Sequence, residues 1–174
     1  MRKFLILNGP NLNLLGMRQP EIYGHLSLDN VSQELLEYAA HQGYELGFYQ
    51  SNSEGGLIDA VQEADFIFDG IIFNPGAYSH YSYALADAVY AINIPVIEVH
   101  LTDITKREPF RATSVIAPAC AGQFMGKHLY SYKEALDFLD SIAEDAKGEI
   151  ENACDVELKS DSDSTKDAEG GANE

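Results

Sequence analysis

Short apolar runs alternate along the chain with longer stretches whose apolar residues recur at helical spacing. The short runs are rich in Ile, Val and Phe, which is typical of strands buried on both faces of a sheet. They predict strands over Lys3–Asn8, Glu45–Gln50, Gly70–Asn74, Pro95–His100 and Ser114–Ala117. The longer stretches predict helices over Ser27–His41, Leu57–Phe66, Tyr81–Ala91 and Tyr132–Ala146.

This alternation predicts a parallel sheet covered by helices on both faces. Five strands in 174 residues suggest an α/β fold with a flavodoxin-like, doubly wound sheet in a single domain. The fold alone says little about function. It does indicate where to look, because open α/β sheets bind their ligands at the carboxyl ends of the strands.

The last part of the chain differs in composition from the rest. Residues 144–174 contain eleven Asp or Glu and three Lys, with few large apolar side chains. Such a segment buries too little apolar surface to offset the entropy of ordering it. We therefore expect a catalytic domain over residues 1–147 and a disordered acidic tail over residues 148–174.

Charge and hydropathy exclude several classes of partner. The formal net charge of −17 argues against nucleic acid, whose binding needs a basic face. The apolar run Phe4–Leu7 is too short for a signal peptide or a membrane span. The two cysteines, Cys120 and Cys154, form neither a metal-ligand spacing nor a disulfide framework. We expect a cytoplasmic protein.

Polar residues cluster where four of the five predicted strands end. The segment after the first strand, residues 8–24, holds three asparagines followed by Arg18 and Tyr23. The second strand runs into Q-S-N-S-E-G at residues 50–55. Because the carboxyl ends of parallel strands share one edge of the sheet, these groups are expected to converge.

The third and fourth strands end in groups with acid–base and anion-binding chemistry. Asn74, His80 and Asp87 follow the third strand, and Ser79 can cap a helix that starts near His80. Glu98 and His100 share one face of the fourth strand by its period of two. The next loop carries Arg107 and Arg111, with Pro109 between them arguing against a helix. Singly these are ordinary structural residues, but together they indicate a site.

Five separated motifs carry a resemblance to a known family. They are G-P-N-L-N-L-L-G-x-R-x-P-x-x-Y-G, Q-S-N-x-E-G, N-P-G-A-Y-S-H, V-I-E-V-H-L and R-E-P-F-R. Over residues 3–140 the sequence resembles type II 3-dehydroquinate dehydratase, a hydro-lyase of the shikimate pathway. The resemblance implies a flavodoxin-like fold, trimers assembled into a dodecamer, a small anionic cyclic substrate, no cofactor and no metal.

The resemblance also implies a role for each matching residue. Tyr23 would be the base, His100 the acid and Arg18 the group that stabilises the tyrosinate. Contacts to substrate would come from Asn74, His80 and Arg111, from the backbone N–H groups of Leu101 and Thr102, and from Asp87 of a neighbouring subunit. In support, Asn11 would position a water, Glu98 would orient His100, and Arg107 would lie with Arg111 on a lid.

The chemistry explains why a base of this kind needs a cation. Removing water next to a ketone requires a base for the C–H proton, stabilisation of an enolate and an acid for the departing hydroxyl. Tyrosine normally titrates near pH 10, so Tyr23 is a poor base by itself. One cation at ~4 Å is worth about 4 kcal/mol at an effective dielectric constant near 20, so Arg18 could suffice.

Two other functions remain possible from the sequence. A flavodoxin-like module could bind flavin or a nucleotide, but the turn after the first strand holds Pro10 and asparagines rather than a Gly/Ser/Thr-rich phosphate loop. A non-catalytic assembly protein could have retained the fold. An ultraviolet assay of the conjugated enone product would separate the enzyme from both.

Overall fold

The computed structural model describes residues 1–17 and 25–142 and contains one five-stranded sheet. The sheet and the site below lie in a compact unit formed by residues 1–140. The strands are β1 (Arg2–Asn8), β2 (Tyr44–Gln50), β3 (Gly70–Asn74), β4 (Val96–His100) and β5 (Gly122–Met125). All neighbouring strands are parallel, in the order β2-β1-β3-β4-β5. This order is that of flavodoxin-like folds and confirms the predicted fold class.

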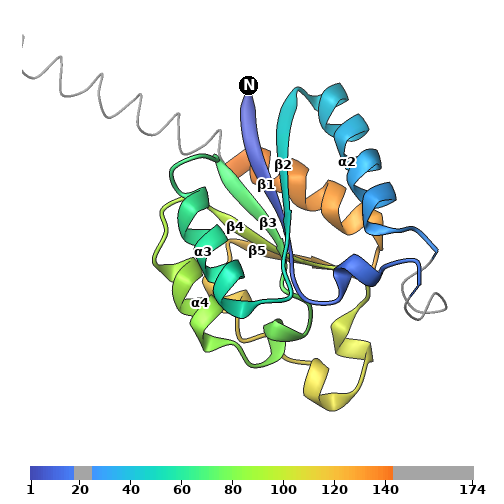
Figure 1. Cartoon of the computed structure of the whole chain (residues 1–174), viewed down its shortest axis with the longest axis vertical. Helices are drawn as coiled ribbons and strands as arrows, with labels where there is room; N and C mark the ends of the chain where they lie inside the picture. Colours follow the sequence, from blue (N-terminus) through green and yellow to red (C-terminus); the bar gives the residue numbers. More distant parts are fainter. Residues whose placement is uncertain (18–24, 143–174) are drawn as a thin grey trace, which may run out of the picture. The chain divides into compact units, whose positions relative to one another are not determined.

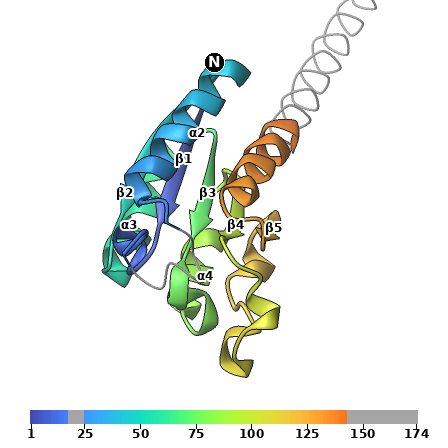
Figure 2. The same cartoon turned by 90° about the vertical axis from the view of Figure 1, so that its right-hand side faces the viewer.

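Helices cover both faces of this sheet (Figures 1 and 2). The labelled helices are α2 (Leu28–Gln42), α3 (Glu54–Ala64) and α4 (Tyr83–Tyr90), and a further helix, here the C-terminal helix, covers residues 129–142. Helices α3 and α4 lie together on one face of the sheet, whereas α2 and the C-terminal helix, drawn in orange, lie on the other. None of the described helices is long and apolar enough to cross a membrane.

Side-chain caps decide where the helices begin. Ser27 caps α2 with a reciprocal bond to Asn30, and Gly43 ends this helix in the left-handed conformation. Helix α3 starts three residues before its predicted start because Ser53 caps it. The cap of α4 is Ser82, so the prediction that Ser79 is the cap was wrong.

The fifth strand is not the predicted Ser114–Ala117. That segment is apolar because Ile116 packs into the core beside α3 and α4, yet it makes no ladder. A 3-10 helix, η5 (Ala117–Ala119), follows with Pro118 in its first turn. The edge strand is Gly122–Met125, whose short and mixed sequence carries little strand signal.

The three strands whose ends carry the site are buried. Strands β3 and β4 are buried along their whole length, and so are the last five residues of β1. Asn8 and Asn74 pair in register at the ends of β1 and β3, so two polar side chains lie next to each other where the core ends.

Some expectations fall on residues outside the described ranges. Arg18 and Tyr23 lie in the gap between residues 17 and 25, and the acidic tail over 148–174 lies beyond residue 142. The predicted helix end at Ala146 and the domain boundary after residue 147 lie there as well. These stay predictions.

Candidate active site

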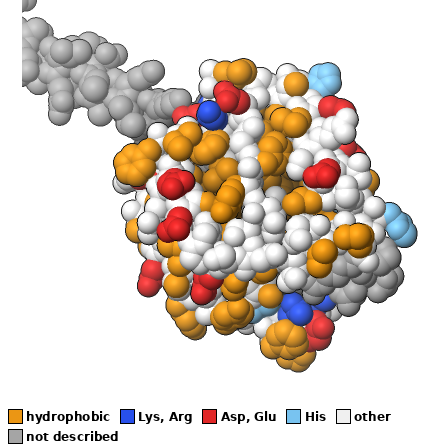
Figure 3. All heavy atoms as spheres, in the orientation of Figure 1, with side chains coloured by type: hydrophobic (Ala, Val, Ile, Leu, Met, Phe, Trp, Pro, Cys, Tyr) orange, Lys and Arg blue, Asp and Glu red, His pale blue; other side chains and the backbone are white. Residues whose placement is uncertain are grey.

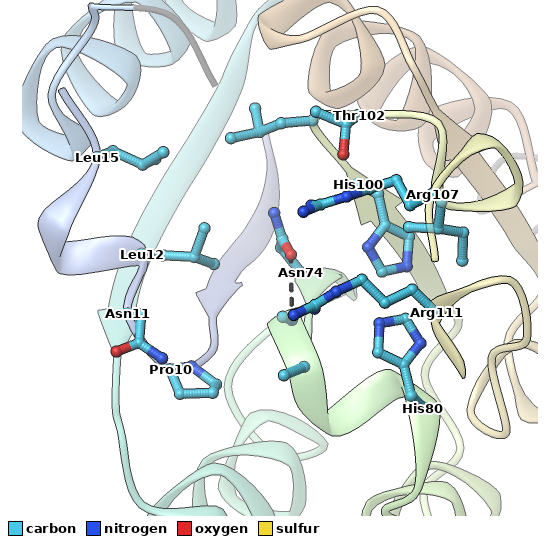
Figure 4. Close-up of a pocket in the computed structure, with 14 residues that line it drawn as sticks. Pro10, Asn11, Leu12, Leu15, Asn74, His80, His100, Thr102, Arg107 and Arg111 are labelled. Atoms are coloured by element: carbon cyan, nitrogen blue, oxygen red, sulfur yellow. Dashed lines mark hydrogen bonds between the residues drawn. The ribbon is translucent and has the colours of Figure 1, made fainter. Parts of the chain in front are cut away.

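A cavity opens at the carboxyl ends of β1, β3 and β4, where the sequence predicted a site. Figure 4 shows histidines and arginines on one side of it and residues of the loop after β1 on the other. Predicted site residues that line it are Asn11, Asn74, His80, His100, Leu101, Thr102, Arg107 and Arg111. Glu98 lies behind His100, whereas Asp87 is an exposed residue of α4 and does not line this cavity.

Two loops approach each other closely at the floor of the cavity. The N–H of Gly9 donates to the carbonyl oxygen of Asn74 at 2.7 Å. A Cβ on Gly9 would lie 2.5 Å from the carbonyl oxygen of Pro75, so no larger residue fits without displacing the backbone. Gly76 has a φ of +59°, which opens the 3-10 helix η2 (Gly76–His80) and brings His80 to the cavity.

His100 is held by Glu98 on the same strand face, as their spacing predicted. The Nε2 atom of His100 lies 2.6 Å from Oε1 of Glu98, and both side chains are buried. At this distance Nε2 carries a hydrogen that it donates to the carboxylate oxygen. Since Glu98 occupies Nε2, Nδ1 is the ring nitrogen left for a ligand.

Glu98 is in turn supported by a residue that the sequence did not single out. The hydroxyl of Ser114 lies 2.8 and 2.9 Å from the two carboxylate oxygens of Glu98 and donates to them. The same oxygen accepts the backbone N–H groups of Ile116 at 3.2 Å and Ala117 at 3.1 Å. Ser114 therefore links the turn at residues 114–117 to Glu98, and through Glu98 to His100.

The bonds of His80 indicate its tautomer. Its Nδ1 lies 2.9 Å from the backbone carbonyl oxygen of Thr113. A carbonyl only accepts, so Nδ1 carries the proton and Nε2 is the ring nitrogen that remains for a ligand. The Ser79 hydroxyl, 3.2 Å from Nδ1, donates instead to the carbonyl oxygen of Gly76.

The side chain of Asn74 is held by two hydrogen bonds beneath the cavity. Its Nδ2 donates to the hydroxyl of Tyr132 at 2.8 Å, and its Oδ1 accepts the N–H of Gly76 at 3.2 Å. The Tyr132 hydroxyl donates in turn to Oδ1 of Asn8 at 2.8 Å. All three side chains are at least 97% buried, so these bonds are shielded from water.

Two guanidinium groups supply positive charge in an acidic protein. Arg107 and Arg111 flank Glu108, whose Oε2 lies 3.6 and 3.3 Å from their Nε atoms. A bond from its own backbone N–H, together with these two charges, lowers the pKa of Glu108. The buried Nε of Arg111 is close enough to Glu108 for an ion pair but makes no hydrogen bond of good geometry within residues 1–17 and 25–142.

The loop after β2 supports the loop after β1. Asn11 takes the left-handed conformation at a φ of 65°, which asparagine tolerates better than most residues. Its N–H donates to Oδ1 of Asn52 at 2.9 Å, and the carbonyl oxygen of Asn52 accepts the hydroxyl of Tyr78. The motif Q-S-N-x-E-G thus acts through Asn52, which does not line the cavity itself.

Together these groups form a donor-rich cavity suited to a small anion. Two arginines and two histidines face it, and no group of three His, Cys, Asp or Glu among the described residues could hold a metal ion. One histidine is backed by a buried carboxylate, an arrangement that can serve a general acid or a general base.

The site residues that sequence reasoning missed are Asn8, Ser114 and Tyr132. Asn8 and Tyr132 had signals that could have revealed them: a polar residue at a strand end, and a tyrosine on the buried stripe of a helix, whose hydroxyl needs a partner. Ser114 was assigned to a strand, which hid its bond to Glu98.

Most of the chain is similar to proteins of one known family. The family model for dehydroquinase class II matches residues 2–140. The 3-dehydroquinate dehydratase of Anoxybacillus flavithermus is 54% identical over 143 residues, which are 82% of this chain and 97% of that protein. That of Bacillus subtilis is 50% identical over 139 residues, 80% of this chain and 94% of the other. The crystal structure of type II dehydroquinase from Butyrivibrio crossotus aligns with a TM-score of 0.79 at 46% identity, over 80% of this chain and 97% of that one.

Proposed function

The chain belongs to the class II dehydroquinase family, and from this premise we propose how its residues carry out the reaction. The reaction is the elimination of water from 3-dehydroquinate to give 3-dehydroshikimate, a step of the shikimate pathway. The enzyme is therefore a hydro-lyase. Membership of this family argues against a flavin- or nucleotide-binding module and against a non-catalytic assembly protein.

His100 is the proposed acid for the departing hydroxyl. The observation that carries this assignment is the 2.6 Å contact between His100 Nε2 and Glu98 Oε1. Glu98 stabilises the protonated imidazole and fixes its plane, so Nδ1–H is the proton available on the cavity side. After the proton leaves, the imidazole is neutral and the hydroxyl departs as water.

Tyr23 is the proposed base, activated by Arg18. Both residues stand in the first family motif and lie outside the described ranges, so the assignment comes from the sequence. The tyrosinate takes the C–H proton next to the ketone, and the enolate forms. Arg18 stabilises the phenolate because its charge does not titrate in the working range. A water positioned by Asn11 donates to the enolate oxygen.

The remaining cavity residues are proposed to hold the substrate. Asn74, His80 and Arg111 bind its hydroxyl groups, and the backbone N–H groups of Leu101 and Thr102 bind its carboxylate. Arg107 and Arg111 line the cavity, where their charge attracts an anion despite the acidic surface of the protein, and the loop that carries them is proposed to act as a lid.

Asp87 is proposed to act across a subunit interface. It is exposed on α4 and away from the cavity of its own chain, so it is free to reach a neighbour's site. Tyr83 and Tyr90, both on α4, and Tyr81 before it are at least 59% exposed, and Figure 3 shows hydrophobic side chains on the surface over this part of the molecule. Exposed aromatic residues in such number favour a buried interface. We propose trimers assembled into a dodecamer, which light scattering after gel filtration would measure.

Two further proposals concern the whole protein. The pathway is biosynthetic and the substrate is a small anion, which favours a cytoplasmic enzyme. The catalytic domain is proposed to cover residues 1–147, with an acidic tail over residues 148–174 that keeps the protein in solution.

The test is an ultraviolet assay of the conjugated product with the wild type and Tyr23→Phe together. Wild type should turn over 3-dehydroquinate, and Tyr23→Phe should not, while substrate binding measured by calorimetry changes little. Tyr130→Phe is the matched control, since Tyr130 is an exposed residue of the C-terminal helix. A near-normal rate for Tyr23→Phe would remove Tyr23 as the base.

A further inference from the structure

Tyr132 is a buried titratable residue that the proposed mechanism does not use. Its side chain has no exposure to solvent, yet its hydroxyl lies between Asn8 and Asn74 at 2.8 Å from each. The tyrosine comes from the C-terminal helix, while the two asparagines end neighbouring strands. A helix on one face of the sheet thus contacts a residue of the active-site cavity.

The directions of these bonds are determined by the single hydroxyl proton. Burial raises the pKa of Tyr132, so this proton stays on the oxygen at physiological pH. The hydroxyl donates it to Oδ1 of Asn8 and must then accept from Nδ2 of Asn74. The N–H of Gly76 independently selects Oδ1 of Asn74 on the other side.

This leaves Asn74 with a defined set of groups for a ligand. One of its Nδ2 hydrogens goes to Tyr132 and one lone pair of Oδ1 goes to Gly76, so one N–H and one lone pair remain. If the carboxamide were turned by 180°, a donor would face the Gly76 N–H, and the cavity would offer its polar groups in the opposite positions.

We propose that Tyr132 is a positioning residue, whose hydroxyl together with Asn8 sets the orientation in which the Asn74 carboxamide meets the substrate. This inference rests on the proposed role of Asn74 in binding a substrate hydroxyl. Neither Tyr132 nor Asn8 lines the cavity, so both act only through Asn74.

The experiment compares KM and kcat of Tyr132→Phe with those of the wild type. Phe keeps the ring in the core and removes the hydroxyl, so KM for 3-dehydroquinate should rise by roughly 3- to 10-fold, the value of one hydrogen bond, with kcat changed less than threefold. A purely structural role would lower the melting temperature and leave KM unchanged, which would overturn the proposal. A wild type without dehydratase activity would instead refute the proposed function.

Tyr38→Phe is the matched control. The Tyr38 hydroxyl donates at 2.5 Å to Asp137, which lies on the same C-terminal helix but away from the cavity. Its loss should leave KM at the wild-type value. An equal rise of KM in both variants would mean that any loss of helix anchoring affects the site, and the proposal would fail.

A double-mutant cycle with Asn74→Ala tests the route of the effect. In the Asn74→Ala background, adding Tyr132→Phe should change KM no further, because the group that it positions is already gone. The same fold-change in both backgrounds would show that Tyr132 acts by another route.

Asn8→Ala provides a second variant in case Tyr132→Phe does not fold. Without its acceptor, the Tyr132 hydroxyl is no longer obliged to accept from Nδ2 of Asn74, so the carboxamide keeps only the Gly76 bond to fix its orientation. KM should rise as in Tyr132→Phe while the tyrosine still fills the core. A KM equal to that of the wild type would contradict the proposal independently.

Discussion

The imidazole of His100 meets the carboxylate of Glu98 at 2.6 Å on one face of β4. Glu98 has no exposure to solvent, so its charge depends on this partner and on the hydroxyl of Ser114. A buried carboxylate is costly to leave without hydrogen-bond partners. The contact with Glu98 fixes the imidazole ring and leaves Nδ1 as the nitrogen on the cavity side.

Glu98→Gln should lower kcat and leave KM nearly unchanged. Glutamine keeps the volume but removes the charge that favours the protonated imidazole. Because a positioned acid contributes roughly 10²–10⁴ to the rate, we expect kcat to fall by about a hundredfold or more. Steady-state kinetics over a range of pH would measure this, and a kcat within twofold of wild type would argue against His100 as the acid.

Ser114→Ala should lower both stability and rate. The change removes a donor from Glu98 and the acceptor of two backbone N–H groups, those of Ile116 and Ala117. Leaving such groups unsatisfied costs about 1–3 kcal/mol, which urea denaturation would detect. Ser51→Ala is a suitable control, because that hydroxyl also serves a backbone N–H but lies in an exposed turn after β2. Equal stability losses in both would contradict the special role of Ser114.

Gly9→Ala should damage the site through the backbone. The new Cβ would lie 2.5 Å from the Pro75 carbonyl oxygen, and overpacking of this kind costs about 1–3 kcal/mol. Gly55→Ala, in helix α3, would meet nothing closer than Ser53 Oγ at 3.9 Å and should instead stabilise by about 0.5–1 kcal/mol. Melting temperatures that shift in opposite directions would agree with this geometry, and similar shifts would disagree with it.

Asp65→Asn should weaken the protein at neutral pH more than in acid. Hydrogen bonds from the backbone N–H and side chain of Asn93 and from the N–H of Ile94 lower the pKa of Asp65. Its contribution is therefore present above the unfolded pKa of about 3.9 and is lost as pH falls through the folded pKa. Urea midpoints of wild type and variant should differ at pH 7, and the difference should shrink as the pH is lowered below the unfolded pKa. A constant gap would exclude this linkage.

Buried strands and their polar ends were predictable from the sequence. Continuous apolar runs such as Gly70–Asn74 have few alternatives in a chain of this length, and this strand was predicted with its observed bounds. That Glu98 and His100 share one strand face followed from the period of a strand, whereas the contact between them was implied by the resemblance. Asn11 and Arg111 were singled out because they stand in loops that follow strands and match the family motifs, and both line the cavity.

Contacts between distant parts of the chain were not predictable. Nothing local to Tyr132 indicates that it meets Asn8, which is 124 positions away along the chain. The strand Gly122–Met125 was missed because its place at the edge of the sheet is decided by pairing with β4 and not by its own residues. Ser114 was assigned to a strand for the converse reason, since the apolar residues after it are buried without pairing.

The place of β1 in the sheet has a consequence for synthesis. This strand pairs with β2 on one side and with β3 on the other, and both partners follow it along the chain. As the polypeptide emerges from the ribosome, β1 can pair with β2 first. The backbone hydrogen-bonding groups on its other edge stay unpaired until β3, which ends at residue 74, has been synthesised. Variants that delay β3 should leave a nascent chain prone to aggregation and to capture by chaperones, even where the finished enzyme is stable.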